Sequence, residues 1–286
     1  MSSRGISRLR TIVQILFALA INGYIVAWFS KPNLYSGSLK GVVLPVLNCY
    51  ACPSALISCP AGSIQHFMAI KAVPFFVLGV MIFLGALVGR FFCGWVCPFG
   101  LLQDILNKIK TRKITIPRWL RFGKYLFLVF TVFLIPYFIS DTLFCKLCPQ
   151  GALEGGIPQM LLNPELHHLA RVLYWSKIAI LIAMLVAMLF IKRFFCRVIC
   201  PIGAMMAIFN KVSLLQMKVV RECCDDCSLC RSVCPVDIDP TDDPNSPECI
   251  RCGMCTACAK SSVKFTTIFS KEKFENVDGK KNIAAT

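Results

Sequence analysis

The chain alternates long apolar runs with short polar segments over its first two thirds. A helix that crosses a membrane needs about 20 mostly apolar residues, and four runs approach that length. They predict helices at Thr11–Phe29, Ala72–Gly89, Tyr125–Phe144 and Val172–Ile191. Beyond about residue 218 the chain is polar, so the pattern predicts a membrane portion followed by a small appended domain.

The first apolar run follows three arginines (Arg4, Arg8 and Arg10), as the core of a signal peptide would. Such a core is only about 7–15 residues long, whereas this run is longer and ends in the aromatic pair Trp28 and Phe29. These features favour an uncleaved membrane helix over a signal peptide.

Lysine and arginine gather before the first predicted helix, between the second and third, and after the fourth. Positive residues beside membrane helices mark the cytoplasmic side. With four helices these three segments share one side, so both termini are predicted to be cytoplasmic. The net charge of +16 then reflects membrane topology, and we expect membrane lipid but no nucleic acid as a partner.

Two short motifs reveal an internal repeat. Arg90–Gly100 reads RFFCGWVCPFG and Arg193–Gly203 reads RFFCRVICPIG, identical at seven of eleven positions. On the opposite side, Leu47–Pro53 loosely parallels Leu143–Pro149. Each unit is a helix, an outer cysteine pair, a second helix and an inner Cys-x₃-Cys-Pro motif. A repeat of this size predicts two halves related by a pseudo-twofold axis along the membrane normal.

The repeat predicts one group of thiols at each membrane face. The inner group is Cys93, Cys97, Cys196 and Cys200. The outer group is Cys49, Cys52, Cys59, Cys145 and Cys148, one more than a four-ligand site needs. Proline after a cysteine fits a helix start, where its missing N–H costs nothing. The N–H groups of that first turn stabilise a thiolate or a negatively charged cluster.

The polar C-terminal domain carries two runs of four cysteines. The first run, from Cys224 to Cys234, has the C-x₂-C-x₂-C-x₃-C-P spacing of bacterial ferredoxins, in which the fourth cysteine ligates the other cluster. The predicted ligands are Cys224, Cys227, Cys230 and Cys258 for cluster 1, and Cys249, Cys252, Cys255 and Cys234 for cluster 2. The second run departs from the pattern, because Ala259 replaces proline and only two residues separate Cys258 from the preceding cysteine.

Other cofactors fit these residues less well. Paired cysteines also bind zinc, but two successive runs with ferredoxin spacing favour iron–sulfur clusters. No haem is expected, because all three histidines, His66, His167 and His168, lie outside the predicted helices. The eighteen cysteines therefore predict two [4Fe–4S] clusters in the C-terminal domain and one or two further clusters at the membrane faces.

The motif F-x-CGW-x-CP-x-G at Phe91–Gly100, joined to a second C-x₃-CP and a two-cluster ferredoxin, resembles the NapH/NosR group of membrane polyferredoxins. The resemblance covers about residues 72–258. It implies four membrane helices, two cytoplasmic [4Fe–4S] clusters and a redox role for the C-x₃-CP cysteines. The group includes a quinol dehydrogenase membrane subunit. The five outer cysteines depart from its simpler members.

We therefore expect an all-α membrane protein with four transmembrane helices in two pseudo-symmetric helix-hairpin repeats, followed by a small ferredoxin-like α+β module. The predicted domains are residues 1–110 and 111–217 for the repeats, 218–260 for the module and 261–286 for a polar tail. The predicted location is a bacterial or archaeal cytoplasmic membrane, which the chain crosses several times.

The sequence favours an electron-transfer subunit of an oxidoreductase complex that contains other redox subunits. Electrons would pass between the quinone pool or an outer-face partner and the cytoplasmic clusters. Two alternatives are a thiol–disulfide relay or metallocentre assembly factor, and a membrane anchor of a larger redox complex. Because about 30 Å of hydrocarbon is too long for one electron jump, the path needs intermediate centres, cysteine loops that dip inward, or electrons that enter from quinol.

Overall fold

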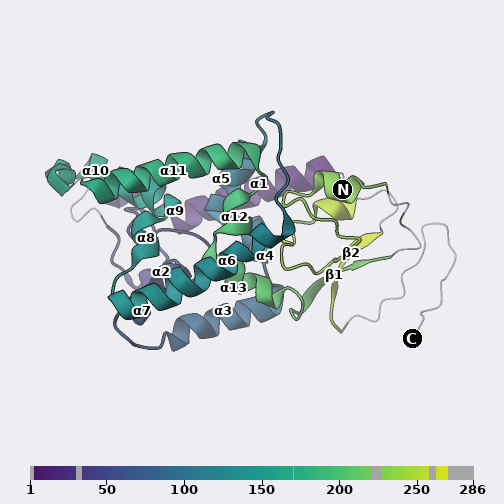
Figure 1. Ribbon diagram of the computed structural model, residues 1–286, viewed down its shortest axis with the longest axis horizontal. Helices are drawn as coiled ribbons and strands as arrows, with labels where there is room; N and C mark the ends of the chain where they lie inside the picture. The colour runs from purple at the N-terminus through teal and green to yellow at the C-terminus, as the bar shows by residue number, and fades with distance from the viewer. Residues whose placement is uncertain are drawn as a thin grey trace.

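The computed structural model describes residues 3–29, 34–169, 171–220, 224, 227–257 and 262–269 (Figure 1). Helices form most of it, and a two-stranded sheet stands at one end, the end at which the N-terminus also lies. The sheet pairs β1 (Leu215–Val219) with β2 (Val263–Thr267) in antiparallel register, Met217 opposite Phe265. Strand β2 lies in the stretch that was predicted to be a polar tail.

The first half of the helical portion contains five α-helices and two short 3₁₀ turns. These are α1 (Ser3–Ile21), η1 (Ile25–Trp28), η2 (Ser38–Gly41), α2 (Pro60–Ala69), α3 (Phe75–Val88), α4 (Phe91–Trp95) and α5 (Pro98–Asn107). The module at the other end adds α14 (Leu229–Val233) and η8 (Met254–Ala257) to the sheet.

The second half opens with a helical stretch that changes type along its length: η3 (Arg118–Phe122), α6 (Gly123–Phe127), the π-helical η4 (Leu128–Leu134) and α7 (Ile135–Ile139). Shorter elements follow: α8 (Leu143–Leu147), α9 (Pro149–Gly151), η5 (Ala152–Gly156), α10 (Ile157–Leu162) and η6 (Pro164–Leu169). It closes with α11 (Val172–Phe190), α12 (Phe194–Val198) and α13 (Pro201–Phe209).

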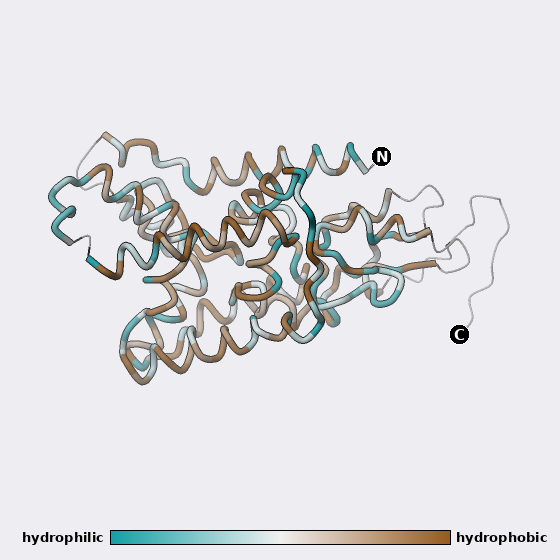
Figure 2. Tube along the Cα trace, turned by 45° about the horizontal axis from the view of Figure 1, so that its top comes forward, coloured by the Kyte–Doolittle hydropathy of each residue, from teal (hydrophilic) through white to brown (hydrophobic). Residues whose placement is uncertain are grey.

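Two helical stretches of the described chain are long and apolar enough to cross a membrane, Arg118–Ile139 and Val172–Phe190, and Phe75–Val88 is a shorter apolar helix. Only 22% and 11% of the most apolar parts of the two longer stretches are buried. The core helix of a water-soluble protein would be mostly buried, whereas these helices present apolar side chains outward, as contact with lipid requires. Figure 2 shows apolar residues along these helices and polar residues at the loops that join them.

The first two helix predictions differ from the structure in their limits. The helix predicted at Thr11–Phe29 is α1, which runs from Ser3 to Ile21. It ends at Asn22 and Gly23, two residues of low helix propensity, and its charged first half is retained because Arg10 is buried against Asp104 at 2.8 Å. The helix predicted at Ala72–Gly89 is α3, which is shorter and runs from Phe75 to Val88.

The other two helices were predicted more closely. The third begins earlier than predicted, at Arg118, and ends at Ile139, because Ser140 adopts a left-handed conformation with φ of 56°. The fourth was predicted to within one residue of α11.

The two copies of the inner motif adopt similar local structures. After α3 and α11 the chain turns through a residue with positive φ, but not at equivalent positions. Gly89, with φ of 54°, precedes the first motif, whereas Arg193, with φ of 48°, begins the second, and its counterpart Arg90 has φ of −80°. A five-residue helix follows, α4 or α12, and then a Cys-Pro step begins α5 or α13. Because α13 is buried from Pro201 to Ala207, the second Cys-Pro helix lies inside the bundle, where its first turn faces other thiols.

Candidate metal centres

The second ligand set of the C-terminal module lines one cavity. Its thiols are the four that the ferredoxin spacing predicted: Cys234, Cys249, Cys252 and Cys255. Met217 of β1, Val236 and Ile250 form apolar walls around them. The fourth thiol of this cavity, Cys234, therefore comes from the other cysteine run, and that the four bind cluster 2 stays a prediction.

The first ligand set is described only in part. Cys224, Cys227 and Cys230 are among the described residues, and Cys230 lies near the second set, with its Sγ 4.0 Å from the Cys255 carbonyl oxygen. The predicted fourth ligand, Cys258, lies outside the described residues. Cluster 1 and its four ligands therefore stay a prediction.

The four inner thiols meet in a second cavity, at the centre of the helical portion. Cys93 and Cys196 lie on the short helices α4 and α12, and Cys97 and Cys200 cap the helices α5 and α13. All four are at most 6% exposed, and they line one apolar cavity with residues that include Phe99 and Phe195. The inner group predicted from the repeat is thus brought together from both halves.

Two fully buried arginines, one from each half, each bond the backbone of an inner cysteine in the other half. Arg90 of the first half donates to the carbonyl oxygen of Cys196 at 3.0 Å, and Arg193 of the second half donates to that of Cys93 at 2.7 Å. Each arginine is also paired with a carboxylate: Arg193 with Asp104 at 2.5 Å, and Arg90 with Glu248 at 3.3 Å. The exchange is what a pseudo-twofold axis requires, and the sequence analysis did not identify it although both arginines begin the repeated motif.

The outer cavity, of about 240 Å³, is lined by four of the five outer thiols: Cys49, Cys59, Cys145 and Cys148. Cys59 and Cys148 are buried, and both interact electrostatically with Cys49 and Cys145. Cys52 does not line the cavity, and Cys49 is the one thiol of this group that influences its pKa. Cys52 is therefore the outer cysteine that lies apart from the cavity.

The outer thiols also follow a reciprocal pattern. Glu154 of the second half accepts a hydrogen bond from the backbone N–H of Cys49 at 3.0 Å, and Gln65 of the first half accepts one from that of Cys145 at 3.4 Å. Gln65 and Glu154 each lie six residues after a Cys-Pro cysteine, Cys59 or Cys148. The structural partner of Cys148 is thus Cys59. The loose alignment of the outer motifs had set Cys52 opposite Cys148, because it ignored the loop inserted between Cys49 and Cys59.

Two helix N-termini face each of the inner and outer cavities, and every one of these helices begins at a Cys-Pro step. The four cap cysteines are Cys59, Cys97, Cys148 and Cys200, each followed by proline at the first helical position. In each case the backbone N–H of the glycine three residues on points at the thiol; that of Gly203 lies 3.4 Å from Cys200 Sγ. Two helix N-termini facing one cavity stabilise negative charge there.

Among the residues that the structure describes, the inner and module cavities each present four cysteine thiols and no histidine or carboxylate side chain. Such all-cysteine sets are the usual ligands of iron–sulfur clusters, in which each thiolate binds a separate corner. The two cavities are small, about 10 and 20 Å³. The donor set and the buried positive charge fit an anionic cluster.

The segment that carries Cys93 packs directly against the C-terminal module. Cys93 packs in one apolar cluster with Val236, Ile250 and Cys252. Trp95 donates its indole N–H to the carbonyl oxygen of Arg251 at 3.0 Å. Gly94 permits this approach, because a Cβ atom there would lie 2.4 Å from the Ile250 carbonyl oxygen.

The inner and outer cavities share one wall. Leu47 lines both of them, and it belongs to a segment that dips into the bundle: Val46, Leu47 and Asn48 are at most 3% exposed. The backbone N–H of Leu47 points at the Cys97 thiol and that of Asn48 at the Cys59 thiol. The N–H donors to the inner and outer thiols therefore belong to adjacent residues, whose Cα atoms are about 3.8 Å apart.

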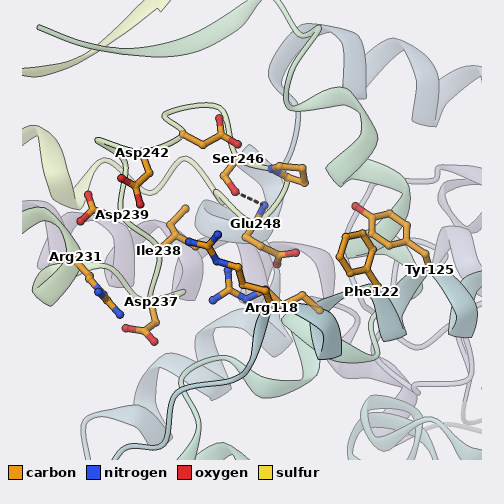
Figure 3. A pocket seen from close by; sticks show the side chains of 13 residues that line it. Arg118, Phe122, Tyr125, Arg231, Asp237, Ile238, Asp239, Asp242, Ser246 and Glu248 are labelled. Carbon is orange, nitrogen blue, oxygen red and sulfur yellow. Dashed lines mark hydrogen bonds between the residues drawn. The ribbon is translucent and has the colours of Figure 1, made fainter. Parts of the chain in front are cut away.

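A larger cavity, of about 520 Å³, separates the acidic connector of the module from the start of the third predicted helix. Figure 3 shows Arg118 reaching between Ile238 and Glu248, with Phe122 and Tyr125 to one side and the aspartates Asp237, Asp239 and Asp242 to the other. The acidic connector thus faces basic residues of its own chain. Ile238 also lines the cavity of the module thiols.

Comparisons with known proteins show similarity to iron–sulfur proteins. A family described as a 4Fe-4S binding domain matches residues 70–117, 122–158 and 174–221, the segments that contain Cys93, Cys97, Cys145, Cys148, Cys196 and Cys200. An uncharacterized protein of Methanocaldococcus jannaschii is 31% identical over 228 residues, covering 74% of this chain and 88% of that protein.

Two named relatives resemble different extents of the chain. The ferredoxin-type protein NapH of Haemophilus influenzae is 27% identical over 277 residues, 89% of this chain and 86% of its own. The regulatory protein NosR of Stutzerimonas stutzeri is 29% identical over 195 residues, 66% of this chain but only 26% of its own. No solved structure matches the chain.

Proposed function

The chain belongs to the NapH/NosR-type polyferredoxin family, and we propose that it is a membrane subunit that carries four [4Fe–4S] clusters in a row. Iron–sulfur electron transport is the role that the family shares. The observation that carries the finer proposal is proximity: the outer cavity shares Leu47 with the inner one, and the inner Cys93 belongs to the same buried apolar cluster as Cys252 of the module.

The bound clusters would supply one-electron carriers, and the chain supplies their ligands and charge balance. Cys49, Cys59, Cys145 and Cys148 would hold the outer cluster, and Cys93, Cys97, Cys196 and Cys200 the inner one. Cluster 1 and cluster 2 keep the ligands predicted from the ferredoxin runs. Arg90 and Arg193, buried at the inner cavity, would balance the negative charge that thiolates and cluster bring into a low-dielectric region.

This arrangement would divide the path of electrons across the apolar layer into shorter steps. The outer cysteine loop dips inward at Val46, Leu47 and Asn48, so no single step has to span about 30 Å of hydrocarbon. At the outer end the cavity is reached past Tyr50 and Lys146, whose side chains are substantially exposed. An outer-face redox partner or a quinone would exchange electrons there, and a cytoplasmic partner would do so at cluster 1.

The burial of the membrane-portion thiols weighs against a thiol–disulfide relay. Exchange is fastest when the attacking thiol has a pKa near the ambient pH. As free thiols, Cys97 and Cys148 are buried, and burial raises the pKa of each to about 12. Such thiols hold almost no thiolate at neutral pH, whereas iron binding displaces the proton outright. We therefore set the cluster role ahead of the relay.

The substitution Cys59→Ser tests the outer site. If Cys59 is a ligand, the purified variant should contain about four fewer iron atoms per chain than the wild type, one cubane's worth. The measurement is anaerobic iron and sulfide quantification. Cys52→Ser is the matched control and should keep the full iron content, because Cys52 lies outside the cavity. Equal iron in both variants would remove Cys59 from the ligand set.

A further inference from the structure

Asn48 is the one residue of the outer cavity wall whose side chain is fully buried with both amide atoms lacking a partner among the described residues. Its exposed fraction is 0%, and no described residue hydrogen-bonds its Nδ2 or its Oδ1. An amide buried in this way loses its bonds to water without replacing them, so such groups normally face a ligand or bound molecule.

The backbone holds Asn48 at the junction of the two membrane cavities. Its own N–H points at the thiol of Cys59, and the N–H of Leu47 points at that of Cys97. The Cys49 backbone is fixed in turn by Glu154 at 3.0 Å. The backbone around Asn48 is therefore fixed at the wall of the outer cavity, which Asn48 lines together with the four outer thiols.

The inner site shows the same kind of contact already made. Gln103 of α5 is fully buried and donates its Nε2–H to the Sγ of Cys196 at 2.9 Å. Hydrogen bonds to the sulfurs are among the features that set the reduction potential of an iron–sulfur cluster. Reduction adds negative charge, so an N–H donor stabilises the reduced state and raises the potential.

We propose that the Asn48 side-chain amide donates a hydrogen bond to a sulfur of the cluster held by the outer thiols and raises its reduction potential. This inference rests on the proposed function, because it requires a cluster at that site. Asn48 would act as a positioning residue: it ligates no iron and transfers no electron. It would set how readily the outer centre takes an electron from its neighbours.

The test is Asn48→Leu in the full-length protein, purified anaerobically and titrated with EPR detection. Leucine keeps the side-chain size and removes the donor. The expected result is unchanged iron content and a lower midpoint potential for one cluster only, by about 59 mV, which is a tenfold change in the reduced-to-oxidised ratio. Asn22→Leu is the control: Asn22 bonds the carbonyl oxygen of Ala18 in its own helix and should shift no potential.

An Asn48→Leu protein with full iron content and unshifted potentials overturns the inference. If leucine causes loss of the outer irons, Asn48→Ala replaces it, since the smaller side chain leaves room for the cluster and still lacks the donor; the same criterion then applies. A wild-type protein that holds only the irons of the C-terminal module refutes the proposed function instead, so the two failures are distinguishable.

Discussion

Cys97→Ser is expected to stop electron transfer between the outer face and the C-terminal module while leaving the module's own EPR signals in place. Cys97 is 6% exposed, caps α5 and lines the inner cavity with Cys93, Cys196 and Cys200. Leu47, whose backbone N–H points at the Cys97 thiol, lines the outer cavity as well as the inner one. Loss of one ligand removes the centre that lies between the other sites.

The measurement is the rate at which the C-terminal clusters are reduced in sealed vesicles by a membrane-impermeant reductant added on the outer side. Mutation of the outer-shell partners of a metal site costs about 10–100-fold in metal affinity or activity, and we expect a fall of at least that order when Cys97→Ser removes a ligand. Cys52→Ser should transfer at the wild-type rate. A wild-type rate in Cys97→Ser would mean that electrons bypass the inner thiols.

Gly94→Ala is expected to weaken the docking of the C-terminal module on the helical portion. A Cβ at Gly94 would lie 2.4 Å from the Ile250 carbonyl oxygen and 3.7 Å from the Cys252 Cα. The first contact is with backbone and cannot be relieved by a side-chain rotation. Overpacking of this kind costs about 1–3 kcal/mol, and here the cost arises where the segment that carries Cys93 packs against the module.

The readouts for Gly94→Ala are faster proteolytic release of the C-terminal module and slower electron transfer into it. Gly79→Ala is the matched control, because no atom lies within 4 Å of a Cβ at Gly79 in the exposed part of α3. It should leave both properties unchanged, or stabilise the helix by about 0.5–1 kcal/mol. Identical proteolysis of the two variants would contradict the docking described for Gly94.

The sequence predicted most of what local spacing can encode. The grouping of the four module thiols, the grouping of the four inner thiols and the helix start at each Cys-Pro step follow from residue order alone. The reciprocal contacts of Arg90 and Arg193 do not, because the repeat shows that two residues are equivalent but not which partner each one meets across the axis.

The predictions of the outer site and of the first helix were less accurate. The extra residues between Cys49 and Cys59 hid the equivalence of Cys59 and Cys148, which only their shared Cys-Pro-x-Gly pattern could have indicated. Hydropathy set the first helix too late, because an arginine buried against Asp104 counts as polar in the sequence. The first inner motif has glycine (Gly94) where the second has arginine (Arg197). The structure explains this difference, because Gly94 lies against the backbone of the C-terminal module.

Anaerobic iron and sulfide quantification of the purified full-length protein, with EPR of the reduced state, tests the central claim most directly. Four cysteine sites of four irons each predict about sixteen iron atoms per chain, and Cys93→Ser should lower that number by about four. An iron content of about eight that Cys93→Ser leaves unchanged would contradict the account, because the clusters would then be confined to the C-terminal module.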